Sequence, residues 1–197
     1  MNLRSKIISF IILSSSFLFV SCDKPTMYAV SNYNIDEYLN RYKLAVEKFE
    51  GGNMHKNDKK YIYSAFAGSN QDWKTYEKKL KEGPKELPVL YAYSNYNLNR
   101  YNLRAKEAKK QRLEQYARKA IPTSSMTLDA TEYFYAASKH NTNTFKKRID
   151  EAVQQGIKKE NQVLCYAMSE HNIDVFIKRY NEAESKFSEI NEANPGE

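Results

Sequence analysis

Ten residues near the C-terminus, CYAMSEHNID from Cys165 to Asp174, place a thiol, an imidazole and a carboxylate close together in the chain. A cysteine nucleophile needs such a base beside it, and the same three groups can also bind a metal ion. Either chemistry requires the three side chains to be held at one point in space. The first question is therefore whether Cys165, His171 and Asp174 form a site, or whether each has a separate structural reason for its position.

The chain contains other copies of this stretch, which give each letter a structural context. In four copies an asparagine follows an alanine by five residues and precedes an aromatic by four, an arginine by seven and a second alanine by eleven; these asparagines are Asn34, Asn97, Asn141 and Asn172. A fifth copy at Asn70 fits this frame only with a slip, because Trp73 stands one residue early. Agreement at so many positions is a strong signal of an internal repeat.

The frame accounts for the three reactive groups one by one. Cys165 takes the position of Phe134 in the preceding copy, so we expect it in the core. The other two align with residues of similar shape: Tyr33, Tyr96 and His140 for His171, and Asp36, Asn99 and Asn143 for Asp174. We therefore predict structural roles for all three. The alternative is an enzyme that uses a Cys165 thiolate, which would need a basic neighbour and exposure to solvent.

A helix, a turn and a second helix explain the spacing within each copy. After the asparagine, the positions at +4, +8 and +11 fall on one helical face. We interpret the asparagine as the left-handed residue that ends the first helix. The Asp or Asn two residues later would then cap the second helix. One hairpin cannot bury its apolar face, whereas stacked copies can. The predicted fold is all-α, an irregular array of about five antiparallel helical hairpins over residues 26–191, with a frayed tail at 192–197.

The run LCYAMSEHNIDVFIKRYNEA (164–183) resembles the two-helix part of an ankyrin repeat. The TPLH opening of that family is missing from every copy. Marker asparagines are 27 to 44 residues apart, against about 33 residues in ankyrin and 34 in tetratricopeptide repeats. The resemblance implies stacked helical hairpins, as a solenoid or a compact bundle, together with a binding role. It supplies no binding residues.

The N-terminus has the layout of an export signal. Arg4 and Lys6 precede an uncharged run at 7–20, which is too short for a bilayer that needs about 20 apolar residues. The segment FVSC (19–22) resembles a bacterial lipobox of the loosened spirochaete type, with Phe19 where leucine is usual. This resemblance implies that residues 1–21 are removed and that Cys22 carries a thioether-linked diacylglycerol. The alternative is a plain secretory signal with a free Cys22.

Acylation of Cys22 would decide both location and redox state. Two or three acyl chains anchor a protein stably to a membrane. Residues 22–25 would form a short tether, and the chain would be attached to the cell envelope, at the outer membrane or cell surface; surface and periplasmic display remain alternatives. Cys165 would then be the only cysteine left. We therefore expect no internal disulfide, although the exported location permits one.

Positive charge is concentrated in one segment. The net charge of +7 falls to +5 without the signal, and residues 99–119 alone contribute +6. We interpret this segment as one long helix. Its cations could bind a sulfated polysaccharide, anionic lipid headgroups or an acidic protein; the candidates are Arg104, Lys106, Lys109, Lys110 and Arg112. The alternative is a solvated helix that links two hairpin pairs. Nucleic acid is not an expected partner of an exported protein.

The remaining residues offer little for catalysis. Three scattered histidines and one thiol do not make a metal site, and no cofactor is expected. His55 lies in a predicted loop without matching ligands. The sequence thus predicts a non-enzymatic, membrane-anchored binding module for a host or envelope macromolecule. A structural periplasmic lipoprotein that holds envelope components together is the alternative.

Overall fold

A computed structural model describes residues 22–49, 56–84, 87–122 and 126–193. Every regular element in these ranges is helical, so the all-α prediction is confirmed. His55 lies outside the described residues. The elements are α1 (Lys24–Val30), α2 (Ile35–Lys48), α3 (Lys56–Gly68), α4 (Trp73–Glu82), α5 (Pro88–Tyr93), α6 (Leu98–Lys110), α7 (Leu113–Ala120), the 3-10 helix η1 (Met126–Ala130), α8 (Thr131–Ala137), α9 (Thr142–Gln154), α10 (Glu160–Met168) and α11 (Ile173–Ala193).

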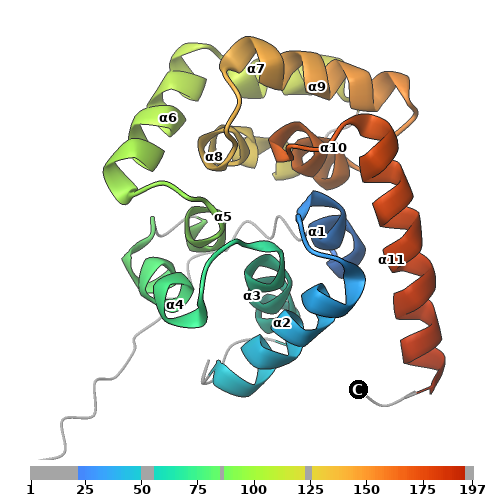
Figure 1. Cartoon of the computed structure of the whole chain (residues 1–197). Helices are drawn as coiled ribbons and strands as arrows, with labels where there is room; N and C mark the ends of the chain where they lie inside the picture. The colour runs from blue at the N-terminus through green and yellow to red at the C-terminus, as the bar shows by residue number, and fades with distance from the viewer. Residues whose placement is uncertain (1–21, 50–55, 85–86, 123–125, 194–197) are drawn as a thin grey trace, which may run out of the picture.

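The helices form an inner and an outer layer around one axis (Figure 1). The inner helices contact one another in the order α1, α3, α5, α8, α10, and α10 contacts α1 again, so their contacts close on themselves. Outer helices pack on the inner helix of the following copy: α2 on α3, α4 on α5, α6 on α8 and α9 on α10. The last outer helix, α11, packs on α1. The first and last copies are therefore neighbours in space.

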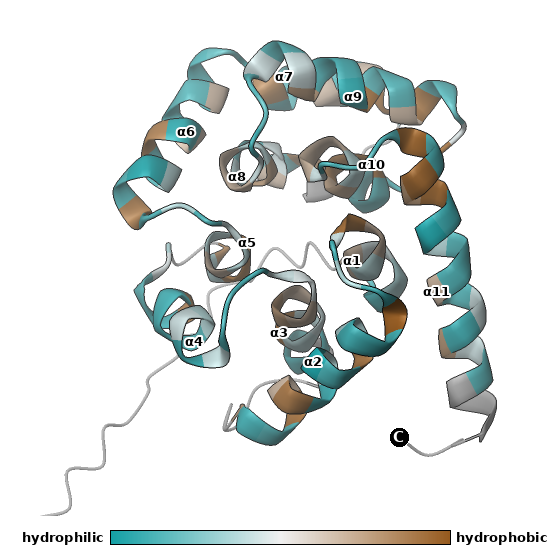
Figure 2. Ribbon diagram, viewed as in Figure 1, coloured by the Kyte–Doolittle hydropathy of each residue, from teal (hydrophilic) through white to brown (hydrophobic). Residues whose placement is uncertain are grey.

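The buried core takes apolar residues from both layers. Figure 2 shows that the outer helices also carry long hydrophilic stretches. In each copy one buried ring of the inner helix packs edge-on against one ring of the outer helix, with centroids 5.3 to 5.6 Å apart. These pairs are Tyr28–Tyr38, Phe66–Tyr76, Tyr91–Tyr101, Tyr135–Phe145 and Tyr166–Phe176. Such a pair adds about 0.5–1.5 kcal/mol to the burial of the rings themselves.

The recurring asparagine opens the second helix and does not end the first, so its predicted left-handed role is wrong. Asn34 is extended, with φ −70° and ψ 169°, and its Oδ1 accepts the backbone N–H of Glu37 at 2.9 Å. Asn97, Asn141 and Asn172 accept in the same way from the residue three positions later. A carboxamide at this position satisfies a free N–H of the first turn. The predicted caps Asp36, Asn99, Asn143 and Asp174 lie one residue inside the second helices.

The structure also corrects the frame of the second copy. Asp72, and not Asn70, caps α4 through the backbone N–H of Thr75 at 2.9 Å. With Asp72 in the asparagine position, Tyr76 falls on the aromatic position and Lys79 on the arginine position. The apparent slip therefore disappears. Asn70 stands two residues before the cap and is exposed.

The basic segment 99–119 is not one long helix. It breaks between α6 and α7, where Arg112 adopts a left-handed conformation with φ 52° and ψ 43°. The break lets α7 turn so that Leu113 and Ala117 are fully buried. One straight helix could not bury these two residues together with Tyr101 and Ala108, because the apolar side shifts along the segment.

The expectation that no internal disulfide forms is also contradicted. Cys22, two residues before the start of α1, is joined to Cys165 in α10. Both residues are buried, with exposed fractions of 2% and 0%. The sequence argument excluded this pair because it assigned the sulfur of Cys22 to an acyl chain. The disulfide links the first copy to the last, at the point where the inner helices close on themselves.

Candidate functional site

The arginine seven residues after each cap binds the turn of the next copy. Arg104 is 7% exposed, and its guanidinium donates to the carbonyl oxygens of Tyr135 at 3.0 Å and His140 at 2.7 Å. It also donates to Ser138 Oγ at 3.2 Å and lies 4.3 Å from the ring centroid of Tyr135. The C-terminal carbonyls of a helix lack intrahelical partners. One guanidinium therefore satisfies several acceptors at the end of the neighbouring inner helix, an arrangement that we call the arginine clamp.

The same clamp recurs at other junctions. Arg41 binds the carbonyls of Phe66, Ala67, Ser69 and Gln71. Arg148 binds Tyr166, Ser169 and His171. Arg179 of the last copy binds Tyr28, Ser31 and Tyr33 of the first. In the described part of the chain, the clamps thus follow the same closed order as the helix contacts.

The junction between the second and third copies has a lysine in place of the arginine. Lys79 Nζ donates to the carbonyl of Ser94 and lies 4.7 Å from the ring centroid of Tyr91. Burial lowers the pKa of Lys79 to about 8, because desolvation disfavours its charged form. Gln71 adds hydrogen bonds to the carbonyls of Ala92 at 2.7 Å and Ser94 at 2.6 Å. Lysine cannot reproduce the planar fork of a guanidinium, so this junction has the weaker cation.

Cys165 and His171 have different partners, and Asp174 lies at the surface. The sulfur of Cys165 is bonded to Cys22, and a ring nitrogen of His171 lies 2.7 Å from the carbonyl oxygen of Ser31. Asp174 is exposed in the first turn of α11. His140 bridges to the carbonyl of Ser169 at 2.7 Å in the equivalent way. The two histidines therefore link one turn to the next, as the arginines do.

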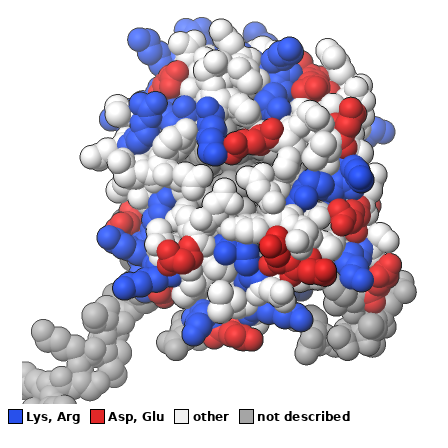
Figure 3. Space-filling view, in the orientation of Figure 1, with Lys and Arg blue, Asp and Glu red and all other residues white. Residues whose placement is uncertain are grey.

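The turns meet around a small depression at one end of the ring, with a volume of about 30 Å³. We call this surface the turn face; Figure 3 shows it with charges of both signs spread over it. One exposed side chain from each copy, two residues before the cap, lines the depression: Asn32, Asn70, Asn95, Lys139 and Glu170. Lys139 and Glu170 form an ion pair at 2.6 Å. The depression has room for about one water molecule.

A second depression, of about 370 Å³, lies on the outer side of the ring. The connection between α9 and α10 forms one wall, with Ile157, Lys158 and Lys159, and α11 forms the other, with Ile177 and Tyr180. Gly156 has φ +80°, which allows the connection to turn sharply, and no atom would meet a Cβ there within 4 Å. This depression is wide and shallow.

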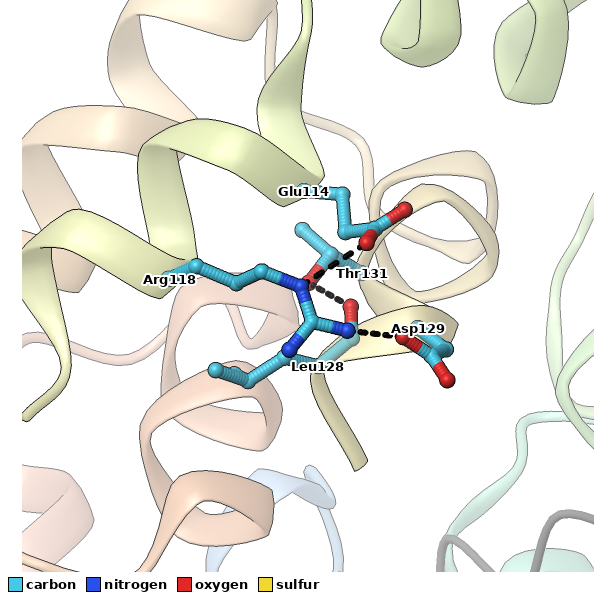
Figure 4. A network of polar contacts seen from close by, with 5 residues as sticks. All are labelled: Glu114, Arg118, Leu128, Asp129 and Thr131. Carbon is cyan, nitrogen blue, oxygen red and sulfur yellow. Dashed lines mark hydrogen bonds and ion pairs between the residues drawn. The ribbon is translucent and has the colours of Figure 1, made fainter. Parts of the chain in front are cut away.

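The candidate polyanion-binding residues separate into two groups. The prediction that Arg104 is a surface cation is wrong, because its side chain is buried in a clamp. Lys106, Lys109, Lys110 and Arg112 are exposed around the end of α6, and we call these four the basic corner. Arg118 on α7 forms ion pairs with Glu114 at 2.9 Å and with Asp129 of η1 (Figure 4). Next to them, the Thr131 hydroxyl donates a hydrogen bond to the carbonyl oxygen of Leu128.

Sequence reasoning missed the clamps although their signal was present. An arginine seven residues after the cap recurred in four copies and was interpreted only as part of a helix face. A cation that recurs at one repeat position beside apolar residues calls for a buried acceptor. Gln71 offered no signal, because the second copy was misaligned.

The chain matches no family model, no curated protein and no solved structure. Within the described ranges, no group of three or more His, Cys, Asp or Glu side chains is placed to hold a metal ion. The helices in those ranges also include none that is long and apolar enough to cross a bilayer.

Proposed function

We propose that this chain is a membrane-tethered binding protein and not an enzyme, built as an array of five helix–turn–helix copies closed into a ring. The fivefold recurrence of the helix cap, the edge-on ring pair and the turn-binding cation supports the array. The closed order of helix contacts supports the ring. Solenoids with open ends need polar capping repeats; a closed array needs none, because each copy has two neighbours.

One observation carries the non-enzymatic proposal: the side chains best suited to chemistry are occupied within the scaffold. The clamp arginines and both described histidines bind turn carbonyls, and Cys165 is fully buried, so its sulfur faces no substrate site with or without the bond to Cys22. Catalysis needs a nucleophile or base that faces a site for substrate. The exposed surface that remains suits recognition, since loops held by a rigid scaffold commonly carry binding residues.

The tether is proposed at Cys22. A thioether to diacylglycerol and a disulfide to Cys165 use the same sulfur, so one molecule has one or the other. In the acylated form Cys22 must leave its buried position, because lipid chains cannot fit where 2% of the residue is exposed. Cys165 then remains as a buried thiol in α10. The lipobox-like FVSC segment supports this form, which would be attached to the outer membrane or cell surface.

The turn face is the proposed binding surface, with a polar host or envelope macromolecule as its partner. Inner helix α1 begins two residues after Cys22 and runs toward the turns, so the turn face points away from the anchor. All five copies contribute an exposed polar side chain to it. Carboxamides both donate and accept hydrogen bonds, which suits a protein or polysaccharide surface.

The test compares intact cells that display the wild-type protein with cells that display Asn32→Ala/Asn70→Ala/Asn95→Ala. Binding to immobilised host-tissue extract is measured after surface display is quantified by protease treatment. We expect the wild type to bind and the triple variant to lose most of that binding. Equal binding by both would refute the assignment of the turn face. Complete protection of the wild type from protease would favour the structural periplasmic lipoprotein.

A further inference from the structure

We infer that the end of the ring opposite the turn face is a contact surface for anionic phospholipid headgroups, with the basic corner as its main element. The inference concerns which face of the ring meets the membrane. The orientation of the ring on the membrane rests on the proposed acylation of Cys22. The attraction between the cations and anionic headgroups does not depend on that acylation. We call this end of the ring the loop end.

The anchor residue stands close to a rigid element. Only Asp23 separates Cys22 from α1, and Asp23 caps that helix by accepting the backbone N–H of Thr26 at 3.0 Å. Helix α1 in turn is packed against α3, α10 and α11. A lipid at residue 22 would therefore hold the ring close to the bilayer, with no long linker to let it turn around. The loop end, where α1 begins, is the face that must approach the lipid.

Cations from separate elements gather at this loop end. Helix α6 starts in a turn at Asn97 and has 13 residues, so it ends about 20 Å away from the turn face at 1.5 Å per residue. Lys109, Lys110 and Arg112 are exposed there. The connection after α9 brings Lys158 and Lys159 to the same end, and both are exposed.

Helix dipoles explain some of these cations but not all of them. Lys109 and Lys110 lie in the last turn of α6, where the dipole favours positive charge. Arg112 and Lys159, by contrast, are the N-cap residues of α7 and α10, where the dipole disfavours a cation and neither side chain makes a capping hydrogen bond. At the turn face the same kind of position is Asn or Asp. Local helix stability therefore does not account for the choice of cations at the loop end.

A flat anionic surface fits this distribution better than a discrete ligand does. The cations stand on the ends of different elements; the basic corner lines neither depression, and Lys158 and Lys159 line only the wide, shallow one beside α11. On the α6 to α10 side of the loop end, Glu107, Glu132 and Glu160 accompany the exposed cations but are outnumbered by them, whereas the side of α2, α4 and α11 carries Glu47, Glu82, Glu184 and Glu189. The ring would thus tilt with the α6 to α10 side toward the lipid. Attraction to anionic lipid acts within about 10 Å of the surface, a distance that the short tether enforces.

The test uses protein that begins at residue 22, carries Cys22→Ser and has no lipid. Sedimentation with vesicles of phosphatidylcholine alone, or mixed with phosphatidylglycerol, measures the partition coefficient at low and high salt. We expect binding only to the mixed vesicles at low salt. Lys109→Ala/Lys110→Ala/Arg112→Ala should reduce the partition coefficient about a hundredfold, since each cation contributes about 1 kcal/mol and about 1.4 kcal/mol is a tenfold change.

The matched control is Lys74→Ala/Lys147→Ala/Lys178→Ala, which removes three exposed lysines from the turn-side halves of α4, α9 and α11. It makes the same change in net charge, so it should keep most of the wild-type binding if position matters. Equal losses in the two triple variants would overturn the inference, as would binding to heparin without binding to mixed vesicles. Because the protein is unlipidated and the turn face is intact, neither result depends on acylation or on the turn-face partner.

Discussion

Arg104→Ala is expected to lower the free energy of unfolding by about 3–5 kcal/mol, because it removes four hydrogen bonds from a charged donor and leaves buried acceptors unpaired. The guanidinium donates to the carbonyls of Ala136 at 3.3 Å, Tyr135 at 3.0 Å and His140 at 2.7 Å, and to Ser138 Oγ at 3.2 Å. A hydrogen bond to a charged group contributes about 1.5–3 kcal/mol. The expected loss is smaller than the sum of these four contributions. Burying the cation costs free energy in the wild type, and water can reach some of the vacated acceptors in the variant.

Urea unfolding followed by circular dichroism measures this loss. Arg100→Ala is the matched control: the residue is exposed, lies one turn earlier on α6 and should change stability by no more than about 0.5 kcal/mol. Arg104→Lys should fall between the two, because one ammonium cannot reach all four acceptors. If Arg104→Ala does not fold, Arg104→Lys still provides the measurement. Equal stabilities for Arg104→Ala and Arg100→Ala would refute the clamp.

Three further predictions follow from the same geometry. Lys79→Arg should stabilise the protein by about 1 kcal/mol, because it adds hydrogen bonds at the weakest junction. The pKa of Lys79 is about 8 in the folded protein and about 10.4 in the unfolded chain, so the wild type gains stability as pH rises from about 8 to about 10.4. Arginine does not titrate in this range, so the stability advantage of Lys79→Arg should shrink over the same interval. A stability difference that does not change with pH would contradict this cause. Asp72→Ala should cost about 1 kcal/mol and Asn70→Ala almost nothing, and the reverse order in thermal melts would restore the sequence-based frame. Mass spectrometry of the exported protein should find Cys22 either acylated or bonded to Cys165 and never both; a free thiol at both positions would remove both assignments.

The sequence allowed the helices and the turn positions to be predicted, but not the role of the turn residues. Spacing of apolar residues depends on local helix geometry, so it is visible in one copy. An asparagine between two helices suits a left-handed stop or an extended cap equally well, and only the backbone dihedral angles distinguish them; Asn34 has φ −70° and ψ 169°. In the second copy Asp72 is the cap residue, but the nearby Asn70 was aligned in its place.

Features that depend on how the copies stack could not be predicted from the sequence. Arg179 could be aligned with Arg104, but its partner is the turn of the first copy, about 150 residues earlier. Whether an array stays open or closes depends on the rotation between neighbours, which accumulates over all copies. The break at Arg112 likewise depends on which surface buries Leu113. Cys22 and Cys165 could be paired only once the two ends of the array were known to meet.

The central claim is that the first and last copies are neighbours in a closed ring, and one distance tests it most directly. Spin labels at Asn32→Cys and Glu170→Cys, in a background of Cys22→Ser and Cys165→Ala, report that distance by pulsed electron resonance. Both residues line the depression in the turn face, although they belong to the first and last copies. A closed ring predicts labels within about 20 Å of each other, or two helix spacings of about 10 Å. An open stack of five copies at the same spacing would separate them by about 40 Å, and that result would contradict the ring.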